Sequence, residues 1–205
     1  MKSIAILGAS GHGKVAAEIA ELCGFNKIVF FDDNKELYLL EDWKIKGDTS
    51  NLISELSEYD ACFVAIGDNK IRVNKTELLL EKKANIVSLI HPSSTVSKYS
   101  TVDKGTIVMA NAVINPFSII GKSCIINSNS TIEHDCQIGN GSHISPNAAL
   151  GGGVIIGEET WIGIGASVKQ KIQIGDNVIL GASSLVISDL PDDIIAFGVP
   201  AKIKT

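Results

Sequence analysis

The chain has 205 residues, 45% of them hydrophobic and 20% charged, and its formal net charge is −5. This composition excludes general disorder, and the length allows one or two domains with a sizeable core. The 18 basic residues are 17 Lys and the single Arg72, which disfavours a nucleic-acid groove built on arginine side chains.

Strands and helices are predicted to alternate over residues 1–90. A buried strand, Ser3–Leu7, leads into a glycine-rich loop, Gly8–Lys14, and then into a helix from about Val15 to Cys23. The later predicted elements are strands at Ile28–Phe31, Ala61–Ile66 and Ile86–Ile90, and a helix from about Asn69 to Lys83. Because such alternation is typical of parallel sheets, we expect a Rossmann-like α/β domain.

Ligands of such a sheet bind at the carboxyl ends of its strands. Three segments lie at those ends: the glycine loop, Asp32–Asp33 and Gly67–Asn69. The glycine spacing, G-x-x-G-x-G, departs from the dinucleotide pattern G-x-G-x-x-G, and the domain is small for a full dinucleotide fold. A helix N-terminus favours anions, so the loop suits a phosphate or a sugar. His12 is then either a donor facing the ligand or a solvent-exposed loop residue.

The second part of the chain has a different composition. Residues 91–205 hold 16 charged residues, against 25 in residues 1–90, and they are rich in Gly, Asn, Ser and Ile. Pro92 ends any preceding regular element. We therefore predict two domains, 1–90 and 91–205.

A branched aliphatic residue recurs at every sixth position of the second part, without a miss. The positions are Ile90, Val96, Val102, Val108, Ile114, Ile120, Ile126, Ile132, Ile138, Ile144, Leu150, Ile156, Ile162, Val168, Ile174, Leu180 and Val186. An α-helix cannot produce this period, which indicates a parallel β-helix with three strands in each 18-residue coil. The position two residues earlier also points inward and is mostly small, so Cys124 and Cys136 are predicted to fill a narrow interior.

Stacked coils place residues 18 apart above one another. Glu133, His134 and Asp135 follow the inward Ile132 and so lie on a corner, and adding 18 to 134 leads to Gly152 within a glycine triplet. A solvated corner and an ordinary turn would explain each motif taken separately. Their adjacency favours a site, because an imidazole, a carboxylate and a bare peptide N–H are the groups that acyl transfer requires.

One outward-facing column is more apolar than the other two. It consists of Ile107, Ile125, His143, Trp161 and Ile179. An exposed apolar stripe marks an interface, so we expect a closed cyclic oligomer that packs through this face. His143 is either a buried interface residue without chemistry or a residue that reaches a ligand between subunits.

The combination of motifs resembles the bacterial nucleotide-sugar N-acetyltransferases of the PglD/NeuD type, over nearly the whole chain. The motifs are Gly8–Gly13, Phe31–Asp33, Ala65–Arg72, Glu133–Gly139 and Gly198–Lys202. The resemblance implies a left-handed β-helix after the Rossmann-like domain, and a homotrimer with its active sites between subunits. It also implies acetyl-CoA as co-substrate, with no permanently bound cofactor.

The same resemblance implies roles for individual residues. His134 matches the general base, Asp135 its acidic partner, which is Glu in some relatives, and Gly152 the amide that faces the thioester oxygen. The positions that match the acetyl-CoA channel are His143, Gly163, Ile164 and Ala182. The positions that match the sugar-nucleotide site are Gly8, Ser10, Gly11, His12, Gly13, Asp32, Asp33, Gly67 and Asn127.

The predicted activity is acetyl transfer from acetyl-CoA to the 4-amine of a nucleotide-linked deoxy-amino-sugar, in glycan biosynthesis. O-acetylation of a sugar or of sialic acid on the same scaffold is the alternative, and a pure binding or scaffold protein remains a third possibility. The nucleotide is left open among UDP, GDP and dTDP.

Metal chemistry and disulfides are not expected. A metal-dependent hydratase on this scaffold needs three converging histidines, but no two of His91, His134 and His143 are 18 residues apart. The four cysteines form no C-x-x-C motif. No apolar run approaches the length of a membrane-spanning helix, and the N-terminal run is too short for a signal peptide, so we expect a cytoplasmic protein.

Overall fold

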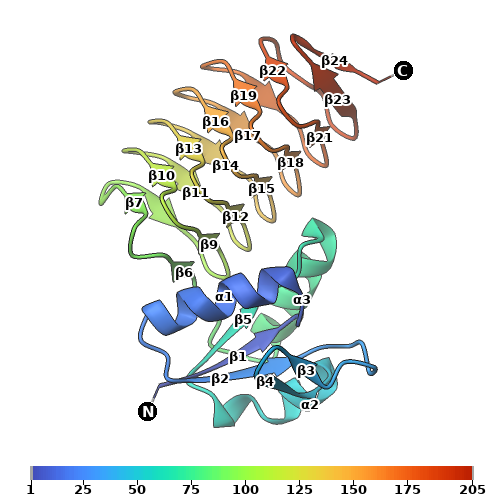
Figure 1. Ribbon diagram of the computed structural model, residues 1–205. Coiled ribbons are helices and arrows are strands. Elements are labelled where there is room, and N and C mark those ends of the chain that lie inside the picture. The colour runs from blue at the N-terminus through green and yellow to red at the C-terminus, as the bar shows by residue number, and fades with distance from the viewer. Residues whose placement is uncertain (1, 205) are drawn as a thin grey trace. The chain divides into compact units, whose positions relative to one another are not determined.

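The computed structural model describes residues 2–204 and divides the chain into two compact units, residues 1–90 and 91–205 (Figure 1). Unit 1 contains one five-stranded sheet with the strand order β3-β4-β2-β1-β5. The strands are β1 (Ser3–Leu7), β2 (Lys27–Phe31), β3 (Leu39–Leu40), β4 (Trp43–Gly47) and β5 (Ala61–Val64). All neighbouring strands pair in parallel except β3 and β4.

Helices complete unit 1. They are α1 (Gly11–Leu22), α2 (Thr49–Ser54), the 3₁₀ helix η1 (Leu56–Glu58) and α3 (Asn69–Glu81). The core is formed by completely buried residues of β1 and β5 together with Phe30 and Phe31 of β2. The alternation of strands and helices therefore confirms the Rossmann-like prediction for this unit.

Several boundaries in unit 1 differ from the prediction. Helix α1 begins at Gly11 rather than near Val15, and β6 is only Leu89–Ile90. Strands β3 and β4 and helix α2 were not predicted from the sequence. Lysines alternate with the apolar residues of β4, and α2 is short and depends on a capping box between Asp48 and Asn51.

Unit 2 is a three-sided coil in which each side is a parallel sheet of two-residue strands (Figure 1). The first sheet contains β7 (Thr95–Val96), β10 (Val113–Ile114), β13 (Thr131–Ile132), β16 (Ala149–Leu150), β19 (Ser167–Val168) and β22 (Leu185–Val186). The second sheet contains β8 (Thr101–Val102), β11 (Ile119–Ile120), β14 (Gln137–Ile138), β17 (Ile155–Ile156) and β20 (Gln173–Ile174).

The third sheet of unit 2 ends in a hairpin. The strands of this sheet that belong to unit 2 are β9 (Ile107–Val108), β12 (Ile125–Ile126), β15 (His143–Ile144), β18 (Trp161–Ile162), β21 (Ile179–Leu180), β23 (Ile195–Gly198) and β24 (Ala201–Ile203). Strands β23 and β24 pair in antiparallel fashion, whereas paired residues of β9 to β21 are 18 positions apart, as Ile125 and His143 are. The predicted coil length is thus confirmed.

The six-residue column forms the core of unit 2. From Val108 to Val186 every member of the column is buried, and Cys124 and Cys136 are buried beside it. The prediction was wrong for Ile90, which is exposed, and Val96 and Val102 are only partly buried. A side chain inside a coil is covered by the coils above and below it, and that cover is incomplete where the stack begins. Among residues 2–204, no helix is long and apolar enough to cross a membrane.

Candidate active site

The corner that joins the first sheet to the second carries the predicted catalytic residues. It comprises residues 97–99, 115–117, 133–135, 151–153 and 169–171, and we call it the His134 edge. On this edge His134 Nδ1 lies 2.7 Å from Asp135 Oδ2, and both side chains are 62% exposed. When Asp135 accepts a hydrogen bond from Nδ1–H, the lone pair of Nε2 in the neutral imidazole is left free to act as a base.

Gly152 lies directly against the imidazole, as the 18-residue spacing predicts. A Cβ on Gly152 would be 2.7 Å from both Cε1 and Nε2 of His134, so only glycine leaves the ring its place. The next residue, Gly153, donates its N–H to His134 O at 2.8 Å. Among the hydrogen bonds of residues 2–204, none involves the Gly152 N–H. A base and an available peptide donor therefore lie on adjacent coils.

Small inward side chains hold this corner in place. Ser118 Oγ donates to Glu133 O at 2.7 Å and accepts from Cys136 N at 3.2 Å. The thiol of Cys136 donates to Gly151 O at 3.3 Å, and burial raises the pKa of this thiol. Cys136 therefore stays protonated and acts as a structural donor, in agreement with its predicted place in the interior.

The residues predicted to contact acetyl-CoA lie elsewhere on the coil. Ile164 and Ala182 are exposed on the corner that joins the third sheet to the first. This corner comprises residues 109–111, 127–129, 145–147, 163–165 and 181–183, and we call it the Ile164 edge. Gly163 lies beside Ile164, and its Cβ would be 2.7 Å from Ala182 N. Within one chain the first sheet separates the Ile164 edge from the His134 edge.

His143 contacts Asn127, a residue that was predicted to belong to a different binding site. Its Nε2 lies 3.0 Å from Asn127 Nδ2, although Asn127 was predicted to contact the sugar nucleotide and His143 the coenzyme. Trp161 was predicted only as a member of the apolar column. The Trp161 ring stacks on His143 at a centroid distance of 5.8 Å and an interplanar angle of 4°, and its Nε1 donates to Ser145 Oγ at 2.8 Å.

The predicted apolar stripe is shorter than expected. Ile107 and Ile125 are buried, so they are not available to a partner. Trp161 and Ile179 are exposed, and the paired Ile195 of β23 extends the exposed part of the column. Ile195 was not predicted as part of the column, because it lies outside the six-residue period.

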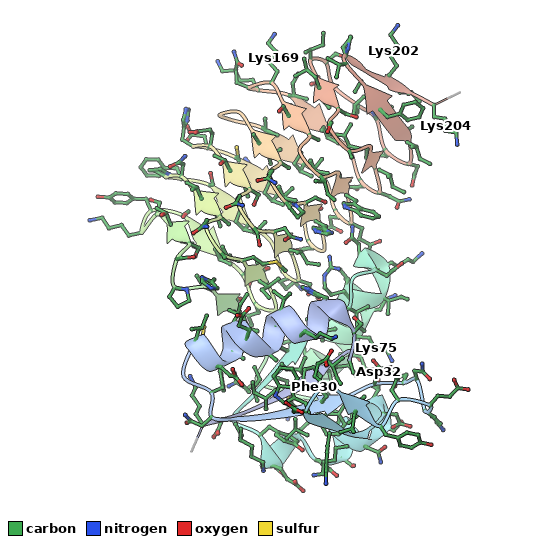
Figure 2. The ribbon with its side chains drawn as sticks, in the orientation of Figure 1. Phe30, Asp32, Lys75, Lys169, Lys202 and Lys204 are labelled. Atoms are coloured by element: carbon green, nitrogen blue, oxygen red, sulfur yellow. The ribbon has the colours of Figure 1, made fainter. Side chains whose placement is uncertain are left out.

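Most of the predicted sugar-nucleotide residues of unit 1 line one cavity of about 360 Å³ at the carboxyl end of the sheet. Gly8, Ser10, Asp32, Asp33 and Gly67 line this cavity together with Ile71 and Lys75, which the prediction did not include. Figure 2 labels Asp32 and Lys75, which lie together at this end of the sheet. Ile71 and Lys75 are four residues apart in α3 and so share a face of the helix, which is the signal that could have identified them.

Charge and backbone geometry shape this cavity. Partial burial opposes the charge of Asp33, but hydrogen bonds from Lys75 Nζ at 2.6 Å and from Thr49 N at 2.8 Å outweigh it and keep the Asp33 pKa below its usual value. Asp32 Oδ2 accepts from Ala9 N at 2.7 Å. Gly8 has φ +111°, and its Cβ would be 2.5 Å from Ala65 O, so the loop requires glycine there.

His12 and Gly13 are placed differently from the prediction. Both lie in the first turn of α1 rather than in the loop, and a Cβ on Gly13 would be 2.5 Å from Gly8 O. Burial, and then the positive charge of Arg72, lower the His12 pKa to about 4, so the imidazole is neutral. Its Nε2 is buried and has no hydrogen-bond partner within residues 2–204. The solvent-exposed alternative for His12 is therefore wrong.

Arg72 holds the loop that carries Gly67. Its buried guanidinium donates to Ile66 O at 2.9 Å, to Gly67 O at 3.0 Å and to Asn69 Oδ1 at 2.7 Å. The buried guanidinium of the one arginine thus binds oxygen atoms of the protein itself.

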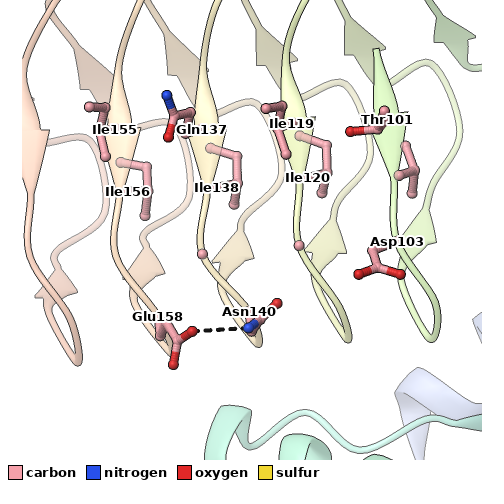
Figure 3. Close-up of a pocket in the computed structure, with 13 residues that line it drawn as sticks. Thr101, Asp103, Ile119, Ile120, Gln137, Ile138, Asn140, Ile155, Ile156 and Glu158 are labelled. Carbon is pink, nitrogen blue, oxygen red and sulfur yellow. Dashed lines mark hydrogen bonds between the residues drawn. The ribbon is translucent and has the colours of Figure 1, made fainter.

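A second concavity lies outside the predicted site. It is a groove of about 570 Å³ on the second sheet, lined by Ile119, Gln137 and Ile155 and bordered by Asn140 and Glu158 (Figure 3). Asn140 Nδ2 donates to Glu158 Oε1 at 2.9 Å. None of the predicted site residues lines this groove.

Family models match both units of the chain. The model of the PglD N-terminal domain matches residues 3–79, and the model of the bacterial transferase hexapeptide, with six repeats, matches residues 117–152 and 153–188. A curated relative, the UDP-N-acetylbacillosamine N-acetyltransferase of Bacillus subtilis, is 38% identical over 113 residues. That alignment covers 54% of this chain and 52% of the relative, about half of its length.

Two solved structures match almost the whole chain. The acetyltransferase domain of PglB from Neisseria gonorrhoeae, in complex with acetyl coenzyme A, is 38% identical with a TM-score of 0.95, and the match covers 99% of both chains. PerB from Caulobacter crescentus, in complex with CoA and GDP-perosamine, is 36% identical with a TM-score of 0.95 over 100% of this chain and 98% of that one. These matches confirm the predicted fold, a Rossmann-like domain followed by a left-handed β-helix. The chain belongs to the PglD-type family of hexapeptide-repeat sugar N-acetyltransferases.

Proposed function

We propose that this protein transfers an acetyl group from acetyl-CoA to the 4-amine of a nucleotide-linked deoxy-amino-sugar, in glycan biosynthesis. The observation that carries the proposal is the contact between the His134–Asp135 pair and Gly152. The family relationship supports acetyl-CoA as the donor, because the PglB structure contains acetyl coenzyme A. A nucleotide-sugar acceptor is supported by the GDP-perosamine in the PerB structure.

The geometry assigns one task to each group. Nε2 of His134 removes a proton as the amine attacks the thioester carbonyl, while Asp135 holds Nδ1 and stabilises the imidazolium that forms. The Gly152 N–H donates to the oxyanion of the tetrahedral intermediate. The new C–N bond is then complete, the C–S bond breaks, and the CoA sulfur leaves with the proton from the imidazolium. No covalent bond to the protein is needed.

The second part of the proposal concerns assembly. We infer that the protein forms a homotrimer whose active sites lie between copies. His134 and the proposed coenzyme contacts Ile164 and Ala182 lie on different edges of one coil, so a second copy is needed to bring them together. The exposed Trp161, Ile179 and Ile195 supply apolar surface for that contact. The free thiols of the four cysteines support a reducing compartment, the cytoplasm.

His134→Ala tests the chemistry. We expect kcat to fall by about 10²–10⁴-fold, the usual contribution of a general base, with little change in KM for either substrate. His91→Ala is the matched control, because the His91 side chain hydrogen-bonds to Ser93 alone among residues 2–204 and lies outside the proposed site. Release of the CoA thiol is followed with GDP-perosamine and with UDP- and dTDP-4-amino-sugars. Wild-type turnover by His134→Ala contradicts the mechanism.

Product analysis distinguishes the two acetyl-transfer chemistries. Mass spectrometry of reactions with amine and with hydroxyl acceptors shows an N-acetyl product if the proposal holds. Acetylation of hydroxyl acceptors alone assigns the O-acetyltransferase alternative, and transfer to none of them favours a binding protein.

A further inference from the structure

One corner residue of the β-helix is apolar although its backbone has positive φ, a conformation in which the other such residues of the coil are glycine or polar. The third residue of a corner commonly adopts positive φ, where glycine and small polar residues are favoured. The non-glycine residues of the coil with positive φ, among those that the structure describes, are Asn111, Phe117, Ser123, Asn129, Asp135, Asn147, Glu159, Lys171, Asn177, Ser183 and Asp193. Phe117, at φ +65°, is the only apolar residue in this set.

The unfavourable backbone conformation of Phe117 is not offset by burial. The Phe117 side chain is 62% exposed and stacks on Tyr99, which is 58% exposed, at a centroid distance of 5.5 Å and an interplanar angle of 26°. Lys98 Nζ lies 4.9 Å from the centroid of the Tyr99 ring. Strained residues that gain nothing from packing are concentrated at functional sites, because the strain persists where function requires the side chain.

The two rings lie on the His134 edge. The N–H of Asp135 donates at 3.1 Å to the carbonyl of Pro116, the residue before Phe117. Tyr99 is one coil further from His134, and coils are spaced by about 4.8 Å. Gly152 lies on the opposite side of His134. Along this edge the order is therefore Tyr99, Phe117, the His134–Asp135 pair and then the glycine triplet.

We propose that Tyr99 and Phe117 form an aromatic platform that binds the nucleotide-sugar acceptor and sets the position of its amine at His134. The inference rests on the proposed function, and it names residues for the acceptor outside the cavity of unit 1. With the thioester at Gly152, the side of His134 that carries the rings is left for the acceptor. The chemistry of the acceptor matches the platform, because a nucleobase presents a flat face to aromatic rings and a sugar ring presents a face of C–H groups. The positively charged ammonium of Lys98 can pair with the phosphates of the acceptor.

Phe117→Asn tests the platform without the risk of misfolding. Asparagine is the residue found at four of the other positive-φ corners, so the melting temperature is expected to rise while the ring is lost. We expect KM for the acceptor to rise about tenfold, the effect of losing one stacking contact, with KM for acetyl-CoA unchanged. Tyr99→Ala is expected to raise the acceptor KM in the same way. Phe117→Tyr keeps an aromatic ring and is expected to have the acceptor KM of the wild type.

Glu159→Asn is the matched control. It makes the same backbone change at φ +53° on a different corner, and it leaves both KM values unchanged if the platform is specific. Titration with UDP, GDP and dTDP shows whether the nucleobase or the sugar ring of the acceptor stacks on the platform. If a free nucleotide binds Phe117→Asn more weakly than the wild type, the ring that stacks on the platform is the nucleobase. If only the complete nucleotide-sugar is affected, the stacked ring is the sugar.

Three outcomes overturn the inference. An unchanged acceptor KM in both Phe117→Asn and Tyr99→Ala, with an active wild type, removes the platform and leaves the proposed function intact. A lower sedimentation mass of Phe117→Asn assigns the rings to a contact between copies instead. If the wild-type protein acetylates none of the acceptors, the proposed function fails, and the platform fails with it.

Discussion

At the scale of single residues, the site depends on the glycine at position 152 as much as on the side chains of His134 and Asp135. The 18-residue coil predicts that Gly152 lies beside His134, because no inserted residue changes the register between them. The sequence could not show that a Cβ at Gly152 would overlap the imidazole, because that depends on how the ring is rotated. It also could not show the contact between His143 and Asn127, since side-chain orientation decides it.

Gly152→Ala is expected to reduce turnover while the protein stays folded. The new methyl group would be 2.7 Å from Nε2 of His134, so the exposed imidazole must rotate away from the reacting amine. We expect kcat to fall by about 10²-fold or more, since a small displacement of a general base has such effects. The melting temperature is expected to change little, because the imidazole moves into solvent.

Gly153→Ala is the control, with the opposite pattern. Its Cβ would meet only Lys171 Cγ, at 3.6 Å, but the residue has φ +69°. Alanine in that conformation costs roughly 1–2 kcal/mol, so the melting temperature is expected to fall more than kcat does. If Gly152→Ala retains full kcat, the base is not the group that lies against Gly152.

At the scale of secondary-structure elements, periodic segments were predicted better than irregular ones. The β-helix strands follow from one inward residue in every six, and each such residue from Val108 to Val186 is buried. Helix α1 was predicted to start too late because glycine has a low helix propensity, so Gly11 and Gly13 indicate a loop. Packing decides otherwise, since Gly13 lets the helix approach Gly8 closely.

His12 lies in the first turn of α1 with its Nε2 buried, and this leads to a prediction about pH. The His12 pKa is about 4 in the folded protein and 6.5 when unperturbed. Between these values the unfolded chain binds a proton that the folded chain does not, so the free energy of unfolding falls as the pH is lowered from 6.5 towards 4. We expect a loss on the order of 1–2 kcal/mol between pH 7 and pH 5 from this residue alone.

Thermal unfolding of the wild type and of His12→Asn at pH 7 and pH 5 measures this contribution. The drop in stability is expected to be smaller in His12→Asn, and His91→Ala is expected to match the wild type. Asp33 and Asp60, whose pKa values are lowered by hydrogen bonds, lose their contribution at lower pH, below about pH 4, and so do not interfere. Equal drops in all three proteins would show that His12 takes up its proton as readily in the folded chain.

At the scale of the whole molecule, the coil separates groups that one reaction needs together. His134 and Ile164 are 30 residues apart, which is not a multiple of the 18-residue coil, so they must lie on different edges. The sequence therefore contained the information that a single coil does not bring these residues together. It did not show which part of the apolar column is exposed, because the six-residue period does not distinguish the buried Ile107 and Ile125 from the exposed members of the column.

Mixing two inactive variants tests whether the site forms between copies. His134→Ala lacks the base, and Ile164→Glu places a charge at the proposed coenzyme contact, so each variant alone is expected to be nearly inactive. In randomly mixed trimers, a site that takes His134 from one copy and Ile164 from the next is intact in about a quarter of cases. Co-expression at equal levels is therefore expected to restore about a quarter of wild-type kcat. A double variant carrying both changes, mixed with either single variant, should restore nothing. If co-expression of the two single variants also restores nothing while native mass spectrometry shows mixed trimers, each site takes both residues from one chain, and the separation of the two edges has to be bridged within a single coil.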